Sequence, residues 1–240
     1  MSRAGFLHLL HEQKMGLFVS LPRNDVELAR AALNGGADGL KVHINVSHAA
    51  SGTYFGSLSE ERDALERIME VTSGAAVGIV PGAEQMATRH DVRHLGRIGI
   101  DFCDAYAHHM PAWMLAMRDQ VDMAMIVALG AEHDGWQRRA ICDVAPEPPA
   151  GPDAIEASVI SHEGYGEPLN ALDVLTYRRI CAEAQMPVIV PTQRAIVAED
   201  VPLIAECGVA VLLIGAIVTG RDAGSIEEAT RRYRGAIDGA

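Results

Sequence analysis

Short apolar runs alternate with longer amphipathic stretches along almost the whole chain. The runs with the length and composition of buried strands span 16–20, 39–44, 76–80, 101–105, 123–128, 155–160, 188–190 and 211–214. Amphipathic stretches expected to form helices span 25–34, 59–71, 111–119, 172–184 and 202–206, and a last helix begins at Ser225. Strands that are separated by helices pair in parallel, so the pattern predicts repeated βα units.

Eight such units in 240 residues predict an α/β protein with the (β/α)8 TIM-barrel fold, a single domain over residues 1–240. Segments 31–40 and 203–212 support the repeat, because each runs from a helix end through a glycine and a short turn into a buried strand. A doubly wound sheet is the alternative, but no G-x-G-x-x-G follows the first strand. The Pro-rich stretch 142–152 is expected to be a loop.

Composition narrows the class of protein. The net charge of −12 disfavours nucleic acid as a partner, because phosphate backbones require a basic face. The longest strongly apolar run, 209–218, is about half the length of a membrane-spanning helix. Charged or polar residues interrupt the apolar N-terminal stretch, so it is not expected to be a signal peptide. We therefore expect a cytoplasmic protein without a membrane partner, compatible with either a monomer or a homo-oligomer.

The widely spaced cysteines are expected to be free thiols: Cys103, Cys142, Cys181 and Cys207.

The second strand carries the first candidate site residues. Side chains alternate along a strand, so Lys41 and His43 are expected to face the barrel interior while positions 40, 42 and 44 pack against helices. A buried lysine is costly without a partner or a task, which predicts a general base, a Schiff-base nucleophile or an anion-binding group. The alternative is a structural lysine paired with Asp104 or Glu163. The polar stretch 48–56 is expected to be either a lid or a plain surface loop.

Further candidates follow the fourth and sixth strands. Asp104 is expected to orient other groups, and only one of the adjacent His108 and His109 is expected to reach the site. Glu163 is the first choice for a second acid/base group; alternatively it only caps the next element. The histidine and carboxylate spacings do not match a metal site, so neither a metal nor another cofactor is expected.

The last two strand ends are where many barrels bind a phosphate group. Small residues at Gly215 and Ala216 would let backbone N–H groups approach an oxyanion, and Thr192 and Arg194 would add side-chain hydrogen bonds. Ser20 and His108 are further candidates for substrate binding. The alternative is a tight turn that binds no ligand.

The Gly-Ala-Asp-Gly-Leu segment at 36–40 and the closing segment 207–219 resemble the ribulose-phosphate-binding (β/α)8 barrel superfamily. Within it, the chain is most similar to N-acetylmannosamine-6-phosphate 2-epimerase and the thiamine-phosphate synthase-like barrels, over about a fifth of its length. The resemblance implies phosphate binding. It also implies that a Lys/Glu pair moves a proton beside a carbonyl group, with Lys41 and Glu163 as the residues that could do so here.

These observations predict an isomerase or epimerase that acts on a small phosphorylated, sugar-like carbonyl compound. Lys41 and Glu163 would move the proton next to the carbonyl, and His43 would polarise the developing oxyanion. Two alternatives remain open. One is an aldolase or other lyase that forms a Schiff base on Lys41, and the other is a non-catalytic barrel that binds a phosphorylated ligand.

Overall fold

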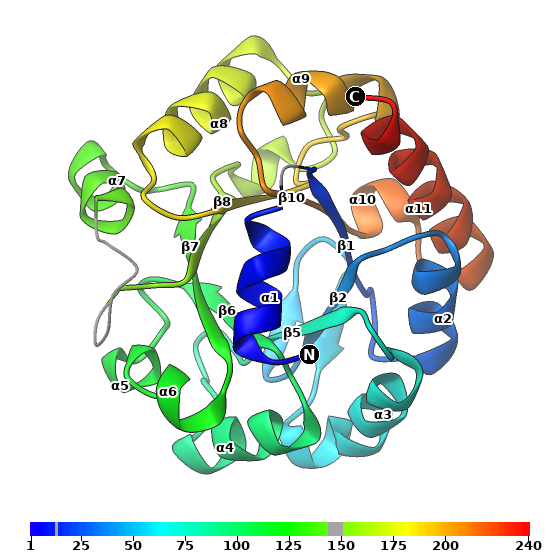
Figure 1. Ribbon diagram of the computed structural model, residues 1–240, viewed down its shortest axis with the longest axis vertical. Helices are drawn as coiled ribbons and strands as arrows, with labels where there is room; N and C mark the ends of the chain where they lie inside the picture. The colour runs from blue at the N-terminus through cyan, green and yellow to red at the C-terminus, as the bar shows by residue number, and fades with distance from the viewer. Residues whose placement is uncertain (13, 144–150) are drawn as a thin grey trace.

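Within the described residues of the computed structural model, 1–12, 14–143 and 151–240, eight parallel strands close into a barrel (Figure 1). Each strand pairs with the next one around the barrel, and the last pairs with the first. In barrel order the strands are β1 (Gly16–Ser20), β2 (Gly39–His43), β5 (Ala76–Val80), β6 (Phe102–Tyr106), β7 (Ala124–Gly130), β8 (Ala154–Ser158), β9 (Val188–Pro191) and β10 (Val211–Ile214). The predicted (β/α)8 fold is confirmed.

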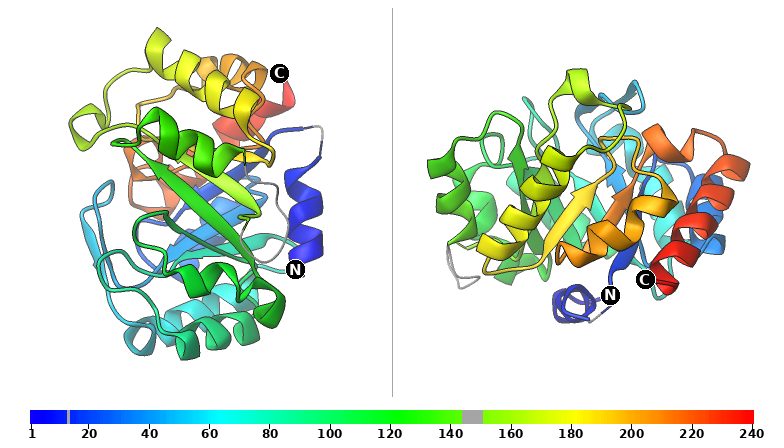
Figure 2. Two further views of the ribbon diagram at one scale, coloured as in Figure 1. Left: turned by 90° about the vertical axis from the view of Figure 1, so that its left-hand side faces the viewer. Right: turned by 90° about the horizontal axis from the view of Figure 1, so that it is seen from above.

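Helices surround the barrel (Figures 1 and 2). They are α2 (Val26–Asn34), α3 (Leu58–Val71), α4 (Arg89–Ile98), α5 (Ala112–Leu115), α6 (Arg118–Val121), α7 (Gly135–Cys142), α8 (Ala171–Glu183), α9 (Val201–Glu206), α10 (Ala216–Thr219) and α11 (Ala223–Asp238), with 3-10 turns η1 (His162–Gly164) and η2 (Ala198–Asp200). The single helix predicted at 111–119 is two short ones, α5 and α6, and both α4 and α7 were missed. Of the stretch 142–152, predicted as a loop, residue 142 ends α7 and residues 144–150 lie outside the described part of the chain.

Two helix starts differ from the prediction because nearby residues are better caps. The helix expected over 59–71 begins at Leu58, because Ser57 is its N-cap and Glu60 completes a capping box with it. The N-cap of α11 is Asp222, whose carboxylate accepts a hydrogen bond from the backbone N–H of Ser225.

The strands present two different faces. On β2, Leu40 and Val42 belong to the buried apolar layer between strands and helices, and so does Ile44, which follows the strand. Lys41 and His43 point the other way, into the barrel, as the alternation predicted.

One end of the barrel is closed by aromatic side chains under α1 (Arg3–Leu10), a helix that crosses this end (Figures 1 and 2). Phe6 of α1 is fully buried and stacks on Phe102, with ring centroids 4.6 Å apart. Gly78 makes room for this packing, because a Cβ atom there would lie 1.9 Å from the Phe102 ring. Phe18 completes the cluster, 5.9 Å from Phe102. The amino-terminal end of the strands is therefore filled, and the carboxyl-terminal end is left for a ligand.

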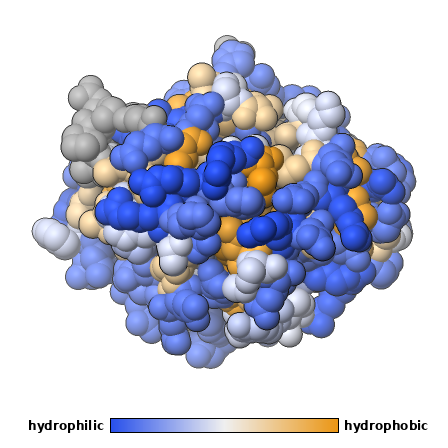
Figure 3. Space-filling model, turned by 90° about the horizontal axis from the view of Figure 1, so that it is seen from below, coloured by the Kyte–Doolittle hydropathy of each residue, from blue (hydrophilic) through white to orange (hydrophobic). Residues whose placement is uncertain are grey.

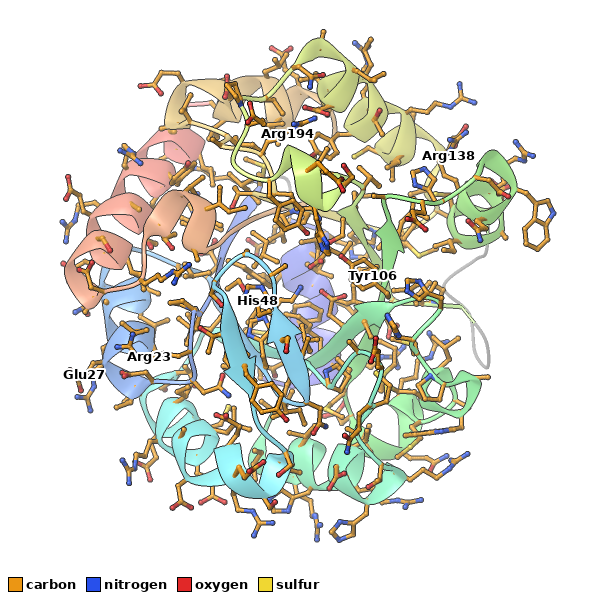
Figure 4. The ribbon with its side chains drawn as sticks, turned by 180° about the vertical axis from the view of Figure 1, so that it is seen from behind. Arg23, Glu27, His48, Tyr106, Arg138 and Arg194 are labelled. Carbon is orange, nitrogen blue, oxygen red and sulfur yellow. The ribbon has the colours of Figure 1, made fainter. Side chains whose placement is uncertain are left out.

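The stretch predicted as a lid or loop contains an antiparallel hairpin, β3 (Val46–His48) and β4 (Thr53–Phe55). Asn45 turns the chain out of β2 with a φ of 53°, a conformation that asparagine tolerates. Seen from behind, the hairpin lies across the carboxyl-terminal mouth of the barrel, with His48 over its centre (Figure 4).

No described helix is both long and apolar enough to cross a membrane. On the outer face shown in Figure 3, hydrophobic side chains form small separate patches among hydrophilic ones.

Candidate active site

A cavity of about 300 Å³ opens at the carboxyl-terminal mouth of the barrel. Its walls come from the ends of β1, β2, β6, β8 and β9, from the β3–β4 hairpin and from the loops after the strands. Among the lining residues that can bind or transfer protons are Lys41, His43, His48, Asp104, Tyr106, His109, Glu156, Ser158, His162, Tyr165 and Gln193. The position is that of the active site in TIM-barrel enzymes.

At the base of the cavity Lys41 lies between two carboxylates. Its ammonium nitrogen Nζ donates to Asp104 Oδ2 at 2.7 Å and also to Glu156 Oε2. All three side chains are buried, with 6% of Lys41, 1% of Asp104 and 5% of Glu156 exposed. Buried charges of this kind require close partners, and the three residues supply them to one another.

The three residues meet across Ala128, a small residue on the strand between the two carboxylates. β7 runs between β6 and β8, and in the pairing Tyr106 lies beside Ala128, which in turn lies beside Glu156. Ala128 fills little of the interior, so carboxylates from β6 and β8 can reach one ammonium group across it. Gly130, further along β7, lies under the Tyr106 ring.

Burial and charge set the protonation of the three groups. Burial by itself lowers the pKa of Lys41, but Asp104 and Glu156 outweigh it and raise the pKa, so the ammonium stays charged. Burial and the nearby Glu156 charge raise the pKa of Asp104 well above the usual range, against the effect of Lys41. Burial also acts to raise the pKa of Glu156, but Lys41 and hydrogen bonds from its neighbours outweigh it, and the pKa is lowered.

Neutral imidazoles form the wall above Lys41. Burial, together with the charge of Lys41, lowers the pKa of His43 well below its usual value and that of His48 to about 4. His43 Nε2 lies 3.5 Å from Ser20 Oγ, and the His43 and His48 rings are 4.5 Å apart. Asn24 holds the end of β2 in place: its side chain donates to the His43 carbonyl at 2.7 Å and accepts from the His43 N–H. The site therefore offers neutral imidazoles beside a fixed ammonium.

The structure brings three of the four predicted catalytic residues together: Lys41, His43 and Asp104 line one cavity. Glu163 is not with them. It lies in η1, exposed to solvent, and it does not line the cavity. The ion pairs match the alternative interpretation of Lys41, that of a lysine paired with a carboxylate: Asp104 is one of the two partners named for it, and Glu156 takes the place of the other, Glu163.

Glu156 is the residue that the sequence analysis missed. The sixth strand was expected at 155–160, but β8 is Ala154–Ser158, so the strand ends two residues earlier. With the strand end predicted two residues too late, Glu156 was expected inside the strand and Glu163 in the loop that follows it. The signal was nevertheless present, because Glu156 is a charged residue inside an apolar strand, as Lys41 is.

Three of the predicted substrate-binding residues reach the cavity: Ser20, Thr192 and Gly215 line it. The N–H of Gly215 is already used, however, because it donates to Thr192 Oγ1 at 3.0 Å. This contact holds the ends of β9 and β10 together. It also corrects the expectation that the Gly215 N–H faces a ligand.

The other predicted substrate- and phosphate-binding residues do not line the cavity. Arg194 donates to both carboxylate oxygens of Asp173 and to the Gly164 carbonyl, and it does not line the cavity. His108 is exposed, and it is the adjacent His109 that lines the cavity. Ala216 begins the short helix α10, whose second residue, Ile217, does line it. Among the described residues, no group of three or more His, Cys, Asp or Glu side chains is placed to hold a metal ion.

Comparison with known proteins agrees with the fold. No family model matches the chain, and no curated protein matches its sequence significantly. Among solved structures, thiamine phosphate pyrophosphorylase from Pyrococcus furiosus is 15% identical, with a TM-score of 0.65 over 95% of this chain and 97% of that one. Phosphoribosyl anthranilate isomerase from Thermus thermophilus is 14% identical, with a TM-score of 0.65 over 92% and 99%. Tryptophan synthase from Mycobacterium tuberculosis is 14% identical, with a TM-score of 0.69 over 98% of each chain.

The similarity to these solved structures agrees with the barrel fold that the resemblance implied. At these identities the comparison concerns the fold alone, and the chemistry has to be argued from the site.

Proposed function

We propose that this barrel is an enzyme that moves a proton next to the carbonyl group of a small phosphorylated, sugar-like compound, as an isomerase or epimerase. The observation that carries the proposal is the buried ammonium of Lys41 between two carboxylates at the base of an open cavity. Proton abstraction beside a carbonyl requires a base and a positive or hydrogen-bond-donating group near the oxygen, and the site offers both.

Lys41 would stabilise the oxygen. An ammonium has three N–H donors, and two of them go to Asp104 and Glu156, which leaves one for a substrate oxygen. Because its pKa is raised, Lys41 would carry its charge throughout the cycle, and so it is poorly suited to act as an amine nucleophile. The neutral ring of His43 would donate a second hydrogen bond to the same oxygen as negative charge develops there.

Asp104 would be the base, in the role first expected of Glu163. Its Oδ1 has no hydrogen-bond partner among the described groups although it is buried, whereas both oxygens of Glu156 have donors. A raised pKa makes the Asp104 carboxylate more basic than an ordinary one. It would take the carbon-bound proton and return it to the neighbouring carbon or to the opposite face of the same carbon.

The phosphate group would lie at the end of the cavity formed by Thr192, Gly215 and Ile217. The Gly215 N–H is bonded to Thr192 Oγ1, which accepts this bond and keeps its own proton. The donors that we expect to reach an anion at this end are therefore the Thr192 hydroxyl, the Ser20 hydroxyl and the N–H groups at the start of α10. This is the place that the barrel fold commonly uses for phosphate.

Hydrogen exchange with solvent tests the proposal without knowledge of the product. The protein is incubated in D2O with dihydroxyacetone phosphate, ribulose 5-phosphate and N-acetylmannosamine 6-phosphate, and the C–H signals beside each carbonyl group are followed by NMR. We expect the protein to exchange the hydrogen in at least one of the three, and D104N to lose at least a hundredfold in rate, as is usual when a general base is removed. E163Q is the matched control and should exchange at the wild-type rate. The proposal fails if none of the three exchanges, or if D104N and E163Q behave alike.

A further inference from the structure

The β3–β4 hairpin over the mouth of the barrel is held in a fixed position. Phe55 of β4 is 1% exposed, and the centroid of its ring lies 4.6 Å from that of His43 on the barrel. Across the turn of the hairpin, the N–H of Gly52 donates to the His48 carbonyl at 2.8 Å. The side chains that this hairpin presents to the cavity are therefore positioned before a ligand binds.

His48 is the residue by which the hairpin can bind a ligand. Its ring lines the cavity, and Figure 4 shows it over the centre of the barrel mouth. Ring nitrogen Nδ1 lies 2.8 Å from the hydroxyl oxygen of Ser51, which belongs to the turn of the same hairpin. No described group is hydrogen-bonded to the other nitrogen, Nε2, and this nitrogen is not sealed from solvent. It is therefore left for a ligand.

The hydroxyl group of Ser51 decides which nitrogen of His48 carries the proton. Ser51 is fully buried, and His48 Nδ1 is its hydrogen-bond partner among the described groups. A buried hydroxyl that finds no acceptor is destabilising, so Ser51 donates to Nδ1. Burial and the charge of Lys41 lower the pKa of His48 to about 4, so the ring is neutral near neutral pH and has a single N–H group. That N–H group is then Nε2–H, on the side of the ligand.

We propose that Ser51 fixes the Nε2–H tautomer of His48 and that this N–H group donates a hydrogen bond to an oxygen of the substrate. The inference deepens the proposed function and rests on it for the nature of the ligand. Lys41 approaches a bound compound from the base of the cavity, and His48 approaches it from the mouth, so the two donors serve different oxygens. His48 thus contacts the substrate, whereas Ser51 acts through His48 as a positioning residue.

Two donors on opposite sides of the ligand fit an enediolate, which has two oxygens on adjacent carbons. The substrate class is then a phosphorylated α-hydroxycarbonyl compound. When the carbonyl group moves to the neighbouring carbon in an isomerisation, the oxygen of that carbon passes its proton to the first oxygen and carries the negative charge in its place. A neutral N–H group stabilises this charge and keeps its own proton. In an epimerisation the second oxygen remains a hydroxyl throughout, so the donor on the hairpin favours the isomerase.

NMR of the whole protein, labelled with 15N in its histidines and without substrate, tests the tautomer. Correlations of the ring nitrogens with the carbon-bound ring protons distinguish Nε2–H from Nδ1–H, and the signals missing from H48Q identify His48. We expect the Nε2–H form at neutral pH in the wild type and a mixture of both forms in S51A, which removes the donor to Nδ1. Y54F is the matched control, because Tyr54 lies on the same hairpin and is 71% exposed. It should leave the His48 signals unchanged.

The contact with the substrate is tested in D2O with dihydroxyacetone phosphate and ribulose 5-phosphate, both phosphorylated α-hydroxycarbonyl compounds. NMR follows hydrogen exchange and the appearance of the isomeric aldose in the same sample. H48L should slow formation of the aldose about a hundredfold, the usual effect of removing one donor to an oxyanion, and slow exchange much less. H48Q should recover part of this loss, because its amide also has an N–H group. S51A should slow the aldose about twofold to tenfold, and it should add nothing in the H48L background.

Near-ultraviolet circular dichroism checks that each variant folds; if S51A does not, S51C, whose thiol is a weaker donor, takes its place. The inference is overturned if His48 is the Nδ1–H tautomer, if S51A leaves the tautomer unchanged, or if S51A slows the reaction as much in H48L as in the wild type. Exchange without an aldose, or exchange confined to N-acetylmannosamine 6-phosphate, would also overturn it while the proposed function stands. Absence of exchange with all three compounds would instead refute the proposed function, whichever tautomer the free protein has.

Discussion

Replacing Lys41 by methionine removes the only cation that contacts either carboxylate of the buried pair in the described structure. Breaking a buried ion pair from one side costs about 3–5 kcal/mol, since a charge is left buried without its partner. We expect K41M to lose about that much free energy of unfolding near neutral pH. D104N should lose less, on the order of 1 kcal/mol, because the pair between Lys41 and Glu156 remains.

The free energy of unfolding that K41M loses should become smaller as the pH falls. Without the ammonium, burial raises the folded-state pKa of Glu156 above its unfolded value, so the folded variant binds a proton more readily than the unfolded chain. The destabilisation of K41M is therefore complete above the folded-state pKa of Glu156. It disappears as the pH falls toward the pKa of Glu156 in the unfolded chain. At about 1.4 kcal/mol per pH unit, lowering the pH from about 7 to about 5.5 should restore roughly 2 kcal/mol relative to the wild type.

Urea unfolding at these two pH values, followed by circular dichroism, measures both effects. The matched control is K14M, because the ion pair of Lys14 with Asp238 is more than half exposed, 56% and 52%. Exposed pairs contribute roughly 0.2–1 kcal/mol, so K14M should change little at either pH. A K41M variant as stable as K14M, or one whose loss is the same at both pH values, would refute the assignment of Lys41 as a buried, charged group.

The remaining predictions concern the reaction, the phosphate end and the barrel floor. The rate of hydrogen exchange should fall as the pH drops below the raised pKa of Asp104, and a flat pH profile would speak against this base. Borohydride added with substrate should leave Lys41 unmodified by mass spectrometry; an adduct there would favour the Schiff-base aldolase. G215V should weaken phosphorylated ligands about tenfold or more in a binding titration and leave unphosphorylated analogues unaffected, whereas G215A should be tolerated because its Cβ would lie 3.6 Å from that of Ser20. F6A should cost about 3–5 kcal/mol in urea unfolding without changing exchange rates at low denaturant, since Phe6 closes the opposite end of the barrel.

The strands could be predicted from the sequence because each is a short apolar run bounded by polar turns and helices. The predicted bounds 16–20, 76–80 and 211–214 match β1, β5 and β10. The helices that were missed include α1 and α4, which bury few side chains. In α1 only Phe6 and Leu10 are buried, and in α4 only Val92 and Leu95 are. The caps of α4 were visible, however, as Thr88 with Asp91 at its start and Gly99 at its end.

The inward face of β2 was predictable for the same reason, since alternation along a strand decides on which side Lys41 and His43 lie. The partners of Lys41 were harder to predict. Because the strand end was predicted two residues too late, Glu163 and not Glu156 was expected at the mouth of the barrel. Alternation along the strand nevertheless puts Glu156 and Ser158 on one face.

The contacts of Arg194 depend on tertiary structure that no local pattern specifies. Its guanidinium is held by Asp173 at the start of α8 and by the Gly164 carbonyl of η1, so its direction follows from where a loop and a helix pack. The use of the Gly215 N–H by Thr192 likewise depends on how the ends of β9 and β10 approach each other.

The most direct test of the proposed chemistry is a crystal structure with phosphoglycolohydroxamate, which mimics the enediolate formed when a proton leaves the carbon beside a carbonyl group. The account predicts that its hydroxamate oxygens lie within about 3.2 Å of Lys41 Nζ and Asp104 Oδ1, with the phosphate group at the start of α10. An analogue that binds outside this cavity, or that binds inside it without touching Lys41 or Asp104, would contradict the account.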